Sequence, residues 1–155
     1  MRKLFVFLFV FLFSVPAFAD IGICSDGAIP FRCGVTWDFN IDLGGGKVGD
    51  DAVFLARARS GIMFVYSELF MSAGISAFYN SKFNVGIQGD LVHMKTGLWI
   101  SPEVALSTSV KPVVGVSGGW SLFGAEMQVE FDNGPHYSWY GKVRIPVGII
   151  MLVFK

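Results

Sequence analysis

Charge is scarce in this sequence of 155 residues, because Asp, Glu, Lys and Arg together make up only 15% of it. Ordinary soluble domains carry about a quarter charged residues. Apolar residues, in contrast, reach 53%. A soluble domain of this size normally covers its surface with more charge, so the shortage argues against that class of protein.

Three other features that the sequence lacks exclude further kinds of protein and binding site. After residue 19 there is no run of about 18 apolar residues, which excludes a membrane-spanning helix in that part of the sequence. The 12 basic residues only equal the 12 acidic ones, so the chain has no basic footprint for nucleic acid. The triple glycine at 44–46 lacks the Gly-Lys-Ser/Thr ending of a phosphate-binding loop, and we predict a flexible strand connection there. We expect no cofactor.

The N-terminus has the pattern of an export signal. Two basic residues open the chain, an unbroken apolar run follows at 4–13, and Ala17 and Ala19 form an A-x-A cleavage site. This pattern predicts a secretory signal peptide over residues 1–19. The alternative is a retained membrane anchor, which is less favoured because the apolar run is too short to span a bilayer comfortably.

The only two cysteines, Cys24 and Cys33, lie close together behind this signal. Export takes them to an oxidising compartment, so we predict a disulfide that ties an N-terminal segment over residues 20–33. A metal site is not expected, because no His lies nearby and two thiolates supply only half of a zinc shell.

Alternation of apolar and polar residues, broken by short turns, recurs through the rest of the chain. This period of two is typical of strands with one apolar and one polar face. We therefore expect residues 34–155 to form a single β-barrel domain. The pattern predicts eight strands at about 34–42, 51–65, 69–79, 83–94, 97–108, 113–118, 120–131 and 137–154.

The stretch from Phe123 to Asp132 shows the two faces most clearly. Apolar side chains such as Met127 occupy its odd positions, whereas Glu126 and Glu130 occupy even ones. When every strand is sorted in this way, no charge interrupts the apolar face, and charges of both signs gather on the polar face. The predicted polar cluster consists of Asp38, Arg57, Arg59, Asp90, Glu103, Glu126, Glu130, Lys142 and Arg144.

Two architectures share this alternation. A soluble periplasmic β-barrel buries the apolar face and can bind an apolar ligand inside. An outer-membrane barrel turns the apolar face to lipid and encloses the polar one. Strands of about ten residues suit a tilted bilayer crossing, and a narrow interior would let the opposite charges neutralise each other. We therefore predict an all-β, antiparallel, up-and-down transmembrane β-barrel, with the soluble barrel as the alternative.

Aromatic residues gather near the predicted turns. Examples are Phe78 with Tyr79, Tyr137 with Trp139, and Trp99. Amphipathic rings favour the boundary between lipid and water, so we predict that these residues belong to interfacial girdles.

The last hairpin permits a prediction of register. A three-residue turn at 133–135 would place Glu126 opposite Lys142 as a cross-strand ion pair. A two-residue turn would instead point Lys142 and Arg144 into lipid, at a cost of ~2–4 kcal/mol each near the midplane. We interpret the interior charges as structural ion pairs rather than as an ion path, because buried charges must be paired.

The chain combines an export signal, about eight alternating strands, an acid–base interior and a last strand that ends in Val153-Phe154-Lys155. In these features it resembles the small eight-stranded outer-membrane barrels of Gram-negative bacteria. The resemblance implies a place in the outer membrane, contact with its lipid, and insertion by the barrel-assembly machinery. It also implies a structural or envelope-related role. Eight strands leave an interior that side chains just fill, so a wide pore is not expected. The sequence does not identify a protein partner.

One local pattern suggests an enzyme as a further alternative. His136-Tyr-Ser138 is similar to the His-x-Ser of outer-membrane lipid A deacylases, which cleave an acyl ester with Ser, His and Glu. Here Glu130 would be the carboxylate that orients the base. In the deacylases an Asn follows the Ser, where this chain has Trp139, and their Glu comes after the Ser. We therefore favour the simpler interpretation, in which His136 caps a turn and Ser138 fills the polar interior.

Overall fold

The computed structural model describes the backbone of residues 20–26 and 29–147, and side chains from Cys33 onward. This part of the chain is one antiparallel sheet in which each strand pairs with the next. No helix among these residues is long and apolar enough to cross a membrane. The strands are β1 (Asp20–Asp26), β2 (Ile29–Val48), β3 (Asp51–Tyr66), β4 (Leu69–Tyr79), β5 (Phe83–His93), β6 (Leu98–Ser107), β7 (Pro112–Trp120), β8 (Phe123–Phe131) and β9 (Pro135–Pro146).

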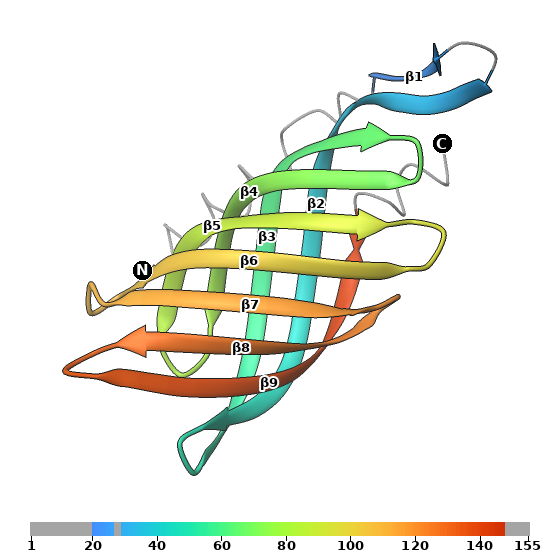
Figure 1. Cartoon of the computed structure of the whole chain (residues 1–155). Helices are drawn as coiled ribbons and strands as arrows, with labels where there is room; N and C mark the ends of the chain where they lie inside the picture. The colour runs from blue at the N-terminus through green and yellow to red at the C-terminus, as the bar shows by residue number, and fades with distance from the viewer. Residues whose placement is uncertain (1–19, 27–28, 148–155) are drawn as a thin grey trace.

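The sheet closes on itself because β9 also pairs with β2. The closing register runs from Asn40 opposite Pro146 to Val48 opposite Ser138. Strands β2 to β9 therefore form an eight-stranded, antiparallel, up-and-down barrel, as the sequence predicts (Figure 1). The first rim is the end with turns 67–68, 94–97 and 121–122; the second rim is the opposite end.

The stagger of the strands fixes the shape of the barrel. One circuit of paired residues runs from Asp38 through Gly61, Gly74, Gln88, Glu103, Gly115, Gln128 and Ser138 to Val48. The circuit returns to β2 ten residues beyond its start. With a rise of about 3.3 Å per residue and about 4.8 Å between strands, this stagger tilts the strands by about 40° from the barrel axis.

Each barrel strand turns most of its apolar residues to the outside. In β6, every residue from Leu98 onward alternates between exposed and buried. The exposed positions include Leu98, Ile100 and Val104, and the buried ones include Ser101 and Glu103. The period of two in the sequence is therefore the period of outward and inward side chains. The polar face lies inside.

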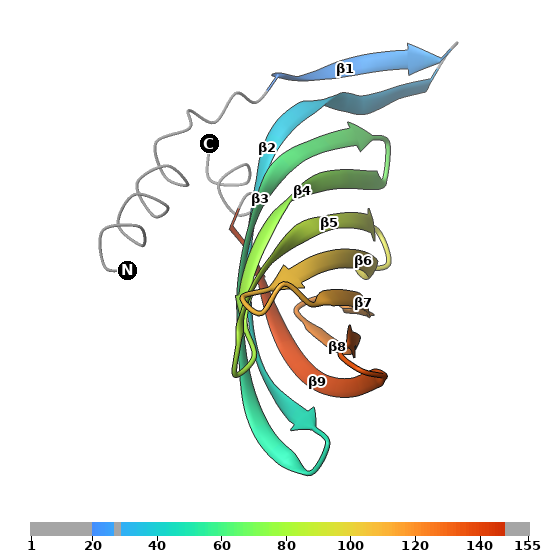
Figure 2. The same cartoon turned by 90° about the vertical axis from the view of Figure 1, so that its left-hand side faces the viewer.

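The N-terminal part of the fold differs from the prediction. Residues 20–26 pair with residues 29–35, so the N-terminal segment is a β-hairpin, and β2 begins before the predicted start of the first strand at residue 34. This hairpin extends beyond the first rim (Figure 2). Turn-forming residues between the two cysteines obscured these strands in the sequence. The Cys24 side chain lies outside the described residues, and the disulfide stays a prediction.

The glycine run was also predicted wrongly, because Gly44 to Gly46 lie inside β2 rather than in a connection. A Cβ atom on Gly44 would collide with the Gly141 carbonyl oxygen, and one on Gly46 with the Trp139 carbonyl oxygen. These glycines therefore let β2 and β9 approach each other where the barrel closes.

The last hairpin has a three-residue turn, but not at 133–135. Phe131 pairs with Pro135, which leaves 132–134 as the turn, and Asn133 and Gly134 adopt positive φ. The register differs from the prediction by two residues, so Glu126 lies opposite Tyr140 instead of Lys142. A shift of two residues keeps every side chain on its face. The predicted end of the last strand, from residue 148 to 154, lies outside the described residues.

Candidate functional site in the barrel interior

The buried side chains of the barrel are mostly polar. Among the described residues, 21 polar or charged side chains are buried, against 8 hydrophobic ones. The buried charges comprise five acids and four bases, all from the inward face of the strands: Asp38, Asp42, Asp90, Glu103, Glu126, Arg57, Arg59, Lys142 and Arg144. Burial of so many charges requires that they be paired.

Arg57, on β3, is the centre of this network. Its guanidinium donates to both carboxylate oxygens of Glu126, at 2.5 and 2.6 Å, and to Glu103 at 2.6 Å. Asp42 lies 3.5 Å away. Glu103 also accepts a hydrogen bond from the Ser76 hydroxyl. Arg57 thus joins β3 to β6 and β8, which lie across the interior from it.

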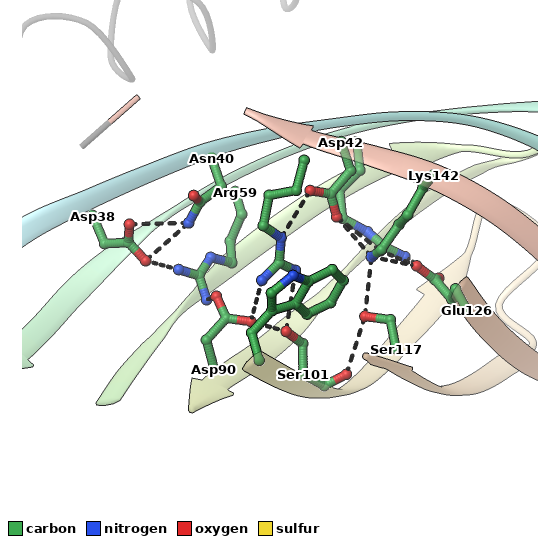
Figure 3. Close-up of polar contacts among 12 residues, drawn as sticks. Asp38, Asn40, Asp42, Arg59, Asp90, Ser101, Ser117, Glu126 and Lys142 are labelled. Carbon is green, nitrogen blue, oxygen red and sulfur yellow. Dashed lines mark hydrogen bonds and ion pairs between the residues drawn. The ribbon is translucent and has the colours of Figure 1, made fainter. Parts of the chain in front are cut away.

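Asp42 connects the centre to β9. One of its carboxylate oxygens accepts a hydrogen bond from Lys142 Nζ at 2.8 Å, and the other accepts one from Arg144 Nε at 3.1 Å. Lys142 also donates to Glu126 at 2.7 Å and to the Ser117 hydroxyl at 3.0 Å (Figure 3). The predicted Glu126–Lys142 ion pair is therefore present, although the two residues are diagonal rather than opposite neighbours.

The network continues toward the first rim through a second arginine. Arg59 forms ion pairs with Asp38 and with Asp90, and Asp90 also accepts a hydrogen bond from Arg144 at 3.1 Å (Figure 3). Asn40 donates to both oxygens of Asp38. Eight of the nine predicted cluster residues belong to this continuous network. Asp42 is the member that the sequence prediction missed, although its even number on β2 places it on the inward face with Asp38 and Asn40.

The ninth predicted residue, Glu130, lies at the second rim. It pairs with Lys82 at 2.8 Å, and both side chains are partly exposed. Nearby, Lys111 donates a hydrogen bond to Asp132. This hydrogen bond, with the charge of Lys111, holds the pKa of the Asp132 carboxyl below its ordinary value. These two pairs tie the turns of the second rim together.

Trp99 was predicted in an interfacial girdle but lies inside the barrel. The guanidinium carbon of Arg144 stands 3.9 Å from the centre of its ring, and its indole nitrogen donates to the Ser121 carbonyl oxygen at 3.0 Å. Gly119 and Gly124 leave room for the ring, because a Cβ on either would collide with it. Leu98 and Ile100 face outward, so the alternation along the strand is the sequence signal that Trp99 between them faces inward.

Apolar side chains fill the interior between the charges and the second rim. Phe78 was also predicted in a girdle, but it is buried there and lies 4.6 Å from the guanidinium carbon of Arg57. This apolar plug consists of Leu55, Phe78, Ala105, Val113 and Tyr140. The plug residues are almost inaccessible to solvent. Beside them a chain of hydrogen bonds runs from Glu126 through Gln128 to Asn80 at the second rim.

At the first rim the interior is less completely filled. A cavity of about 190 Å³ has Asp38, Asp90 and Arg144 among its lining residues. Apolar side chains make up most of its wall: Met63, Phe70, Val92, Met94, Trp99, Leu122 and Pro146. The charge network therefore adjoins tightly packed side chains on the side of the second rim and faces a cavity on the side of the first.

The three enzyme candidates do not form a catalytic arrangement. Glu130 lies directly opposite His136, but its carboxylate pairs with Lys82. The exposed His136 ring is hydrogen-bonded through Nε2 to the Asp132 carbonyl oxygen at 3.0 Å. Ser138 is buried and faces Gln128 across the strand pair. Each group has a structural role, as expected for a turn cap and an interior hydroxyl.

The outer surface of the barrel is apolar over the middle of the strands. Ile75, Ile87 and Val104 are 66%, 69% and 61% exposed and lie side by side on β4, β5 and β6. Exposed aromatic residues stand near both ends of this surface: Tyr66, Trp120 and Phe123 at the first rim, and Tyr79, Phe131 and Tyr137 at the second. The exposed acidic and basic residues in the described part lie in or next to the turns: Lys47, Asp50, Asp51, Glu68 and Lys95.

Comparisons with family models, with curated proteins and with solved structures found no match to this chain.

Proposed function

We propose that this chain is an integral outer-membrane β-barrel protein of a Gram-negative envelope, exported by its N-terminal signal, with a structural or envelope-related role. The observation that carries the proposal is the reversed distribution of side chains, with charges inside and apolar residues outside. In water, so much contiguous apolar surface would favour aggregation. In a bilayer, the same surface is the stable contact with lipid.

The dimensions of the barrel support the same proposal. The ten residues of β6, at about 3.3 Å each and tilted by about 40°, cover about 25 Å along the barrel axis. An outer-membrane barrel has an apolar band about 25 Å tall, with aromatic girdles at both edges. Exposed aromatic residues occupy both rims of this barrel, and among the residues with described side chains the exposed charges occur only near the turns.

The interior favours a closed barrel over a carrier or a channel. A soluble barrel that binds an apolar ligand needs an apolar interior, whereas this one holds nine ion-paired charges. Conduction needs an open path for water and ions, but the buried plug residues Leu55 and Phe78, with the buried side chain of Gln128, fill the interior toward the second rim. The apolar outer surface of the barrel fits membrane lipid as its partner, rather than a small ligand.

Fractionation gives the first test. The full chain, expressed in a Gram-negative host, should remain with the outer membrane after osmotic shock, and its unheated form should migrate differently from its boiled form in detergent gels. Release with the periplasmic fraction would contradict the proposal.

Arginine on the outer face gives a sharper test. Ile87→Arg should destabilise the protein by ~2–4 kcal/mol if this surface lies near the bilayer midplane. On a soluble surface, the same change costs within about 0.5 kcal/mol. Val110→Arg is the control, because Val110 is 77% exposed but lies in the turn between β6 and β7. Urea unfolding in phospholipid vesicles measures both, and equal small effects would refute the proposal.

A further inference from the structure

The cavity at the first rim has an apolar wall and a charged floor. Asp38, Asp90 and Arg144 are its charged lining residues, and most of the other side chains around it are apolar. Gly97 and Leu122, from two turns of the rim, also line it, so the cavity lies at the mouth of the barrel. Its volume of about 190 Å³ exceeds the ~150 Å³ of an apolar protein cavity that holds benzene. It therefore has room for a small organic molecule.

The charges at this end of the network are not balanced. Two carboxylates line the cavity, but only one guanidinium does. Asp38 and Asp90 share Arg59, whose guanidinium lies between their carboxylates (Figure 3). The second base, Arg144, is divided between Asp90 and Asp42. With every group in its ordinary ionised form, the buried network of the described residues carries five negative charges against four positive ones. The floor of the cavity thus favours a positively charged guest.

We propose that this cavity is a binding site for a small organic ammonium ion with an apolar body, such as a monoamine of the size of phenethylamine. The ammonium group lies beside Asp38 and Asp90, where it offsets the excess negative charge. The apolar body contacts the wall of the cavity, which includes Phe70, Val92 and Trp99. This site goes beyond the structural role proposed above and does not depend on it, because the cavity belongs to the inside of the barrel.

Other guests fit the cavity less well. A purely apolar molecule would remove water from the charged floor without replacing the hydrogen bonds of that water, which costs free energy. An anion would meet two carboxylates, and the one guanidinium in the lining already donates to Asp42, Asp90 and Ser101. An ammonium ion can donate three hydrogen bonds to the floor while its body covers the apolar wall.

A matched set of three ligands tests the proposal. At neutral pH phenethylamine is a cation, 2-phenylethanol is its neutral counterpart and phenylacetate is its anionic counterpart. The folded protein is labelled with 5-fluorotryptophan in nanodiscs of zwitterionic phosphatidylcholine, and the fluorine NMR signal of Trp99 is assigned with the variant Trp99→Phe. A saturable shift of this signal measures binding in the cavity. The signal of Trp139, which faces outward, is the control for ligand that dissolves in the lipid.

We expect phenethylamine to bind about tenfold more tightly than 2-phenylethanol, and phenylacetate to bind most weakly, because charges interact strongly across a site with little water. If the alcohol or the anion binds as tightly as the amine, or if the amine gives no saturable shift of the Trp99 signal, the proposal is wrong.

Two changes to the lining place the ligand in the cavity. Val92→Trp puts a larger side chain into it and should weaken phenethylamine binding about tenfold or more, whereas Leu91→Trp, on the adjacent outward-facing residue, should not. Asp38→Asn removes one charge from the floor and should reduce the preference for the amine over the alcohol about threefold or more. Binding that survives Val92→Trp unchanged, or a preference that Asp38→Asn leaves intact, would contradict the proposal. Should Asp38→Asn fail to fold, the comparison of Val92→Trp with Leu91→Trp decides alone.

Discussion

Replacing Arg57 with methionine should destabilise the barrel strongly, because this change removes one charge from a buried network of ion pairs. The Arg57 side chain is 1% exposed and contacts three carboxylates. Glu126 and Asp42 would each keep Lys142 as a partner. Glu103 would keep only the Ser76 hydroxyl. The loss of stability should therefore arise mainly at Glu103, which becomes a buried carboxylate without a positively charged partner.

Breaking a buried ion pair from one side costs ~3–5 kcal/mol, because the remaining charge stays buried and unpaired. We expect a loss of this size for Arg57→Met in urea unfolding in phospholipid vesicles, followed by tryptophan fluorescence. Lys95→Met is the control, because its pair with Glu68 spans 3.7 Å between side chains that are 73% and 50% exposed. An exposed pair of that kind contributes about 0–1 kcal/mol.

A second substitution separates charge from packing. If the cost of Arg57→Met is that of an unpaired Glu103, the double variant Arg57→Met with Glu103→Gln should be more stable than Arg57→Met alone. The coupling energy between the two sites should fall in the range of 0.5–3 kcal/mol that is usual for contacting residues. The reasoning is refuted if the two losses simply add, or if Arg57→Met costs no more than Lys95→Met.

Two further predictions concern packing in the interior, each with a control on the same strand or a neighbouring one. Gly124→Val should prevent the Trp99 ring from packing and destabilise the barrel by about 1–3 kcal/mol or more in the same unfolding assay, whereas Gly141→Val, with no atom near its added Cβ, should have little effect. Phe78→Ala should open the apolar plug, so that planar bilayers containing this variant show ion conductance while the native protein and Tyr79→Ala do not; Tyr79 is the adjacent residue but faces outward.

The faces of the strands were predictable because they depend only on local alternation. The predicted strand 51–65 is β3 without its last residue, and the predicted strand 69–79 has the bounds of β4. Arg57 and Arg59 were placed on the inward face by their odd numbers alone. The same rule would have placed Trp99 and Phe78 inside, but their closeness to turns was given more weight than their face. Face is the stronger signal, because turn proximity says nothing about direction.

Where alternation failed, glycine and cysteine were the cause. The glycine run at 44–46 was interpreted by its flexibility, yet its function in β2 is to leave space for the backbone of β9. The cysteine pair suggested a tied segment, and the strands of the β1–β2 hairpin were missed. At the glycine run, the deciding contact comes from β9, a strand far away in sequence, which no local pattern contains. The two strands of the hairpin, in contrast, are neighbours in the sequence.

The partners within the charge network follow from closure rather than from sequence spacing. A stagger of ten residues brings β9 back to β2 so that Arg144 lies opposite Asp42, about a hundred positions apart in the chain. The same closure lets Arg57 reach Glu126 on β8, which is not a neighbouring strand of β3. A change of register by two residues at the seam would keep every residue on its face but would separate these pairs. The network therefore favours one register over its neighbours, which gives the buried charges a role in specifying the closed barrel.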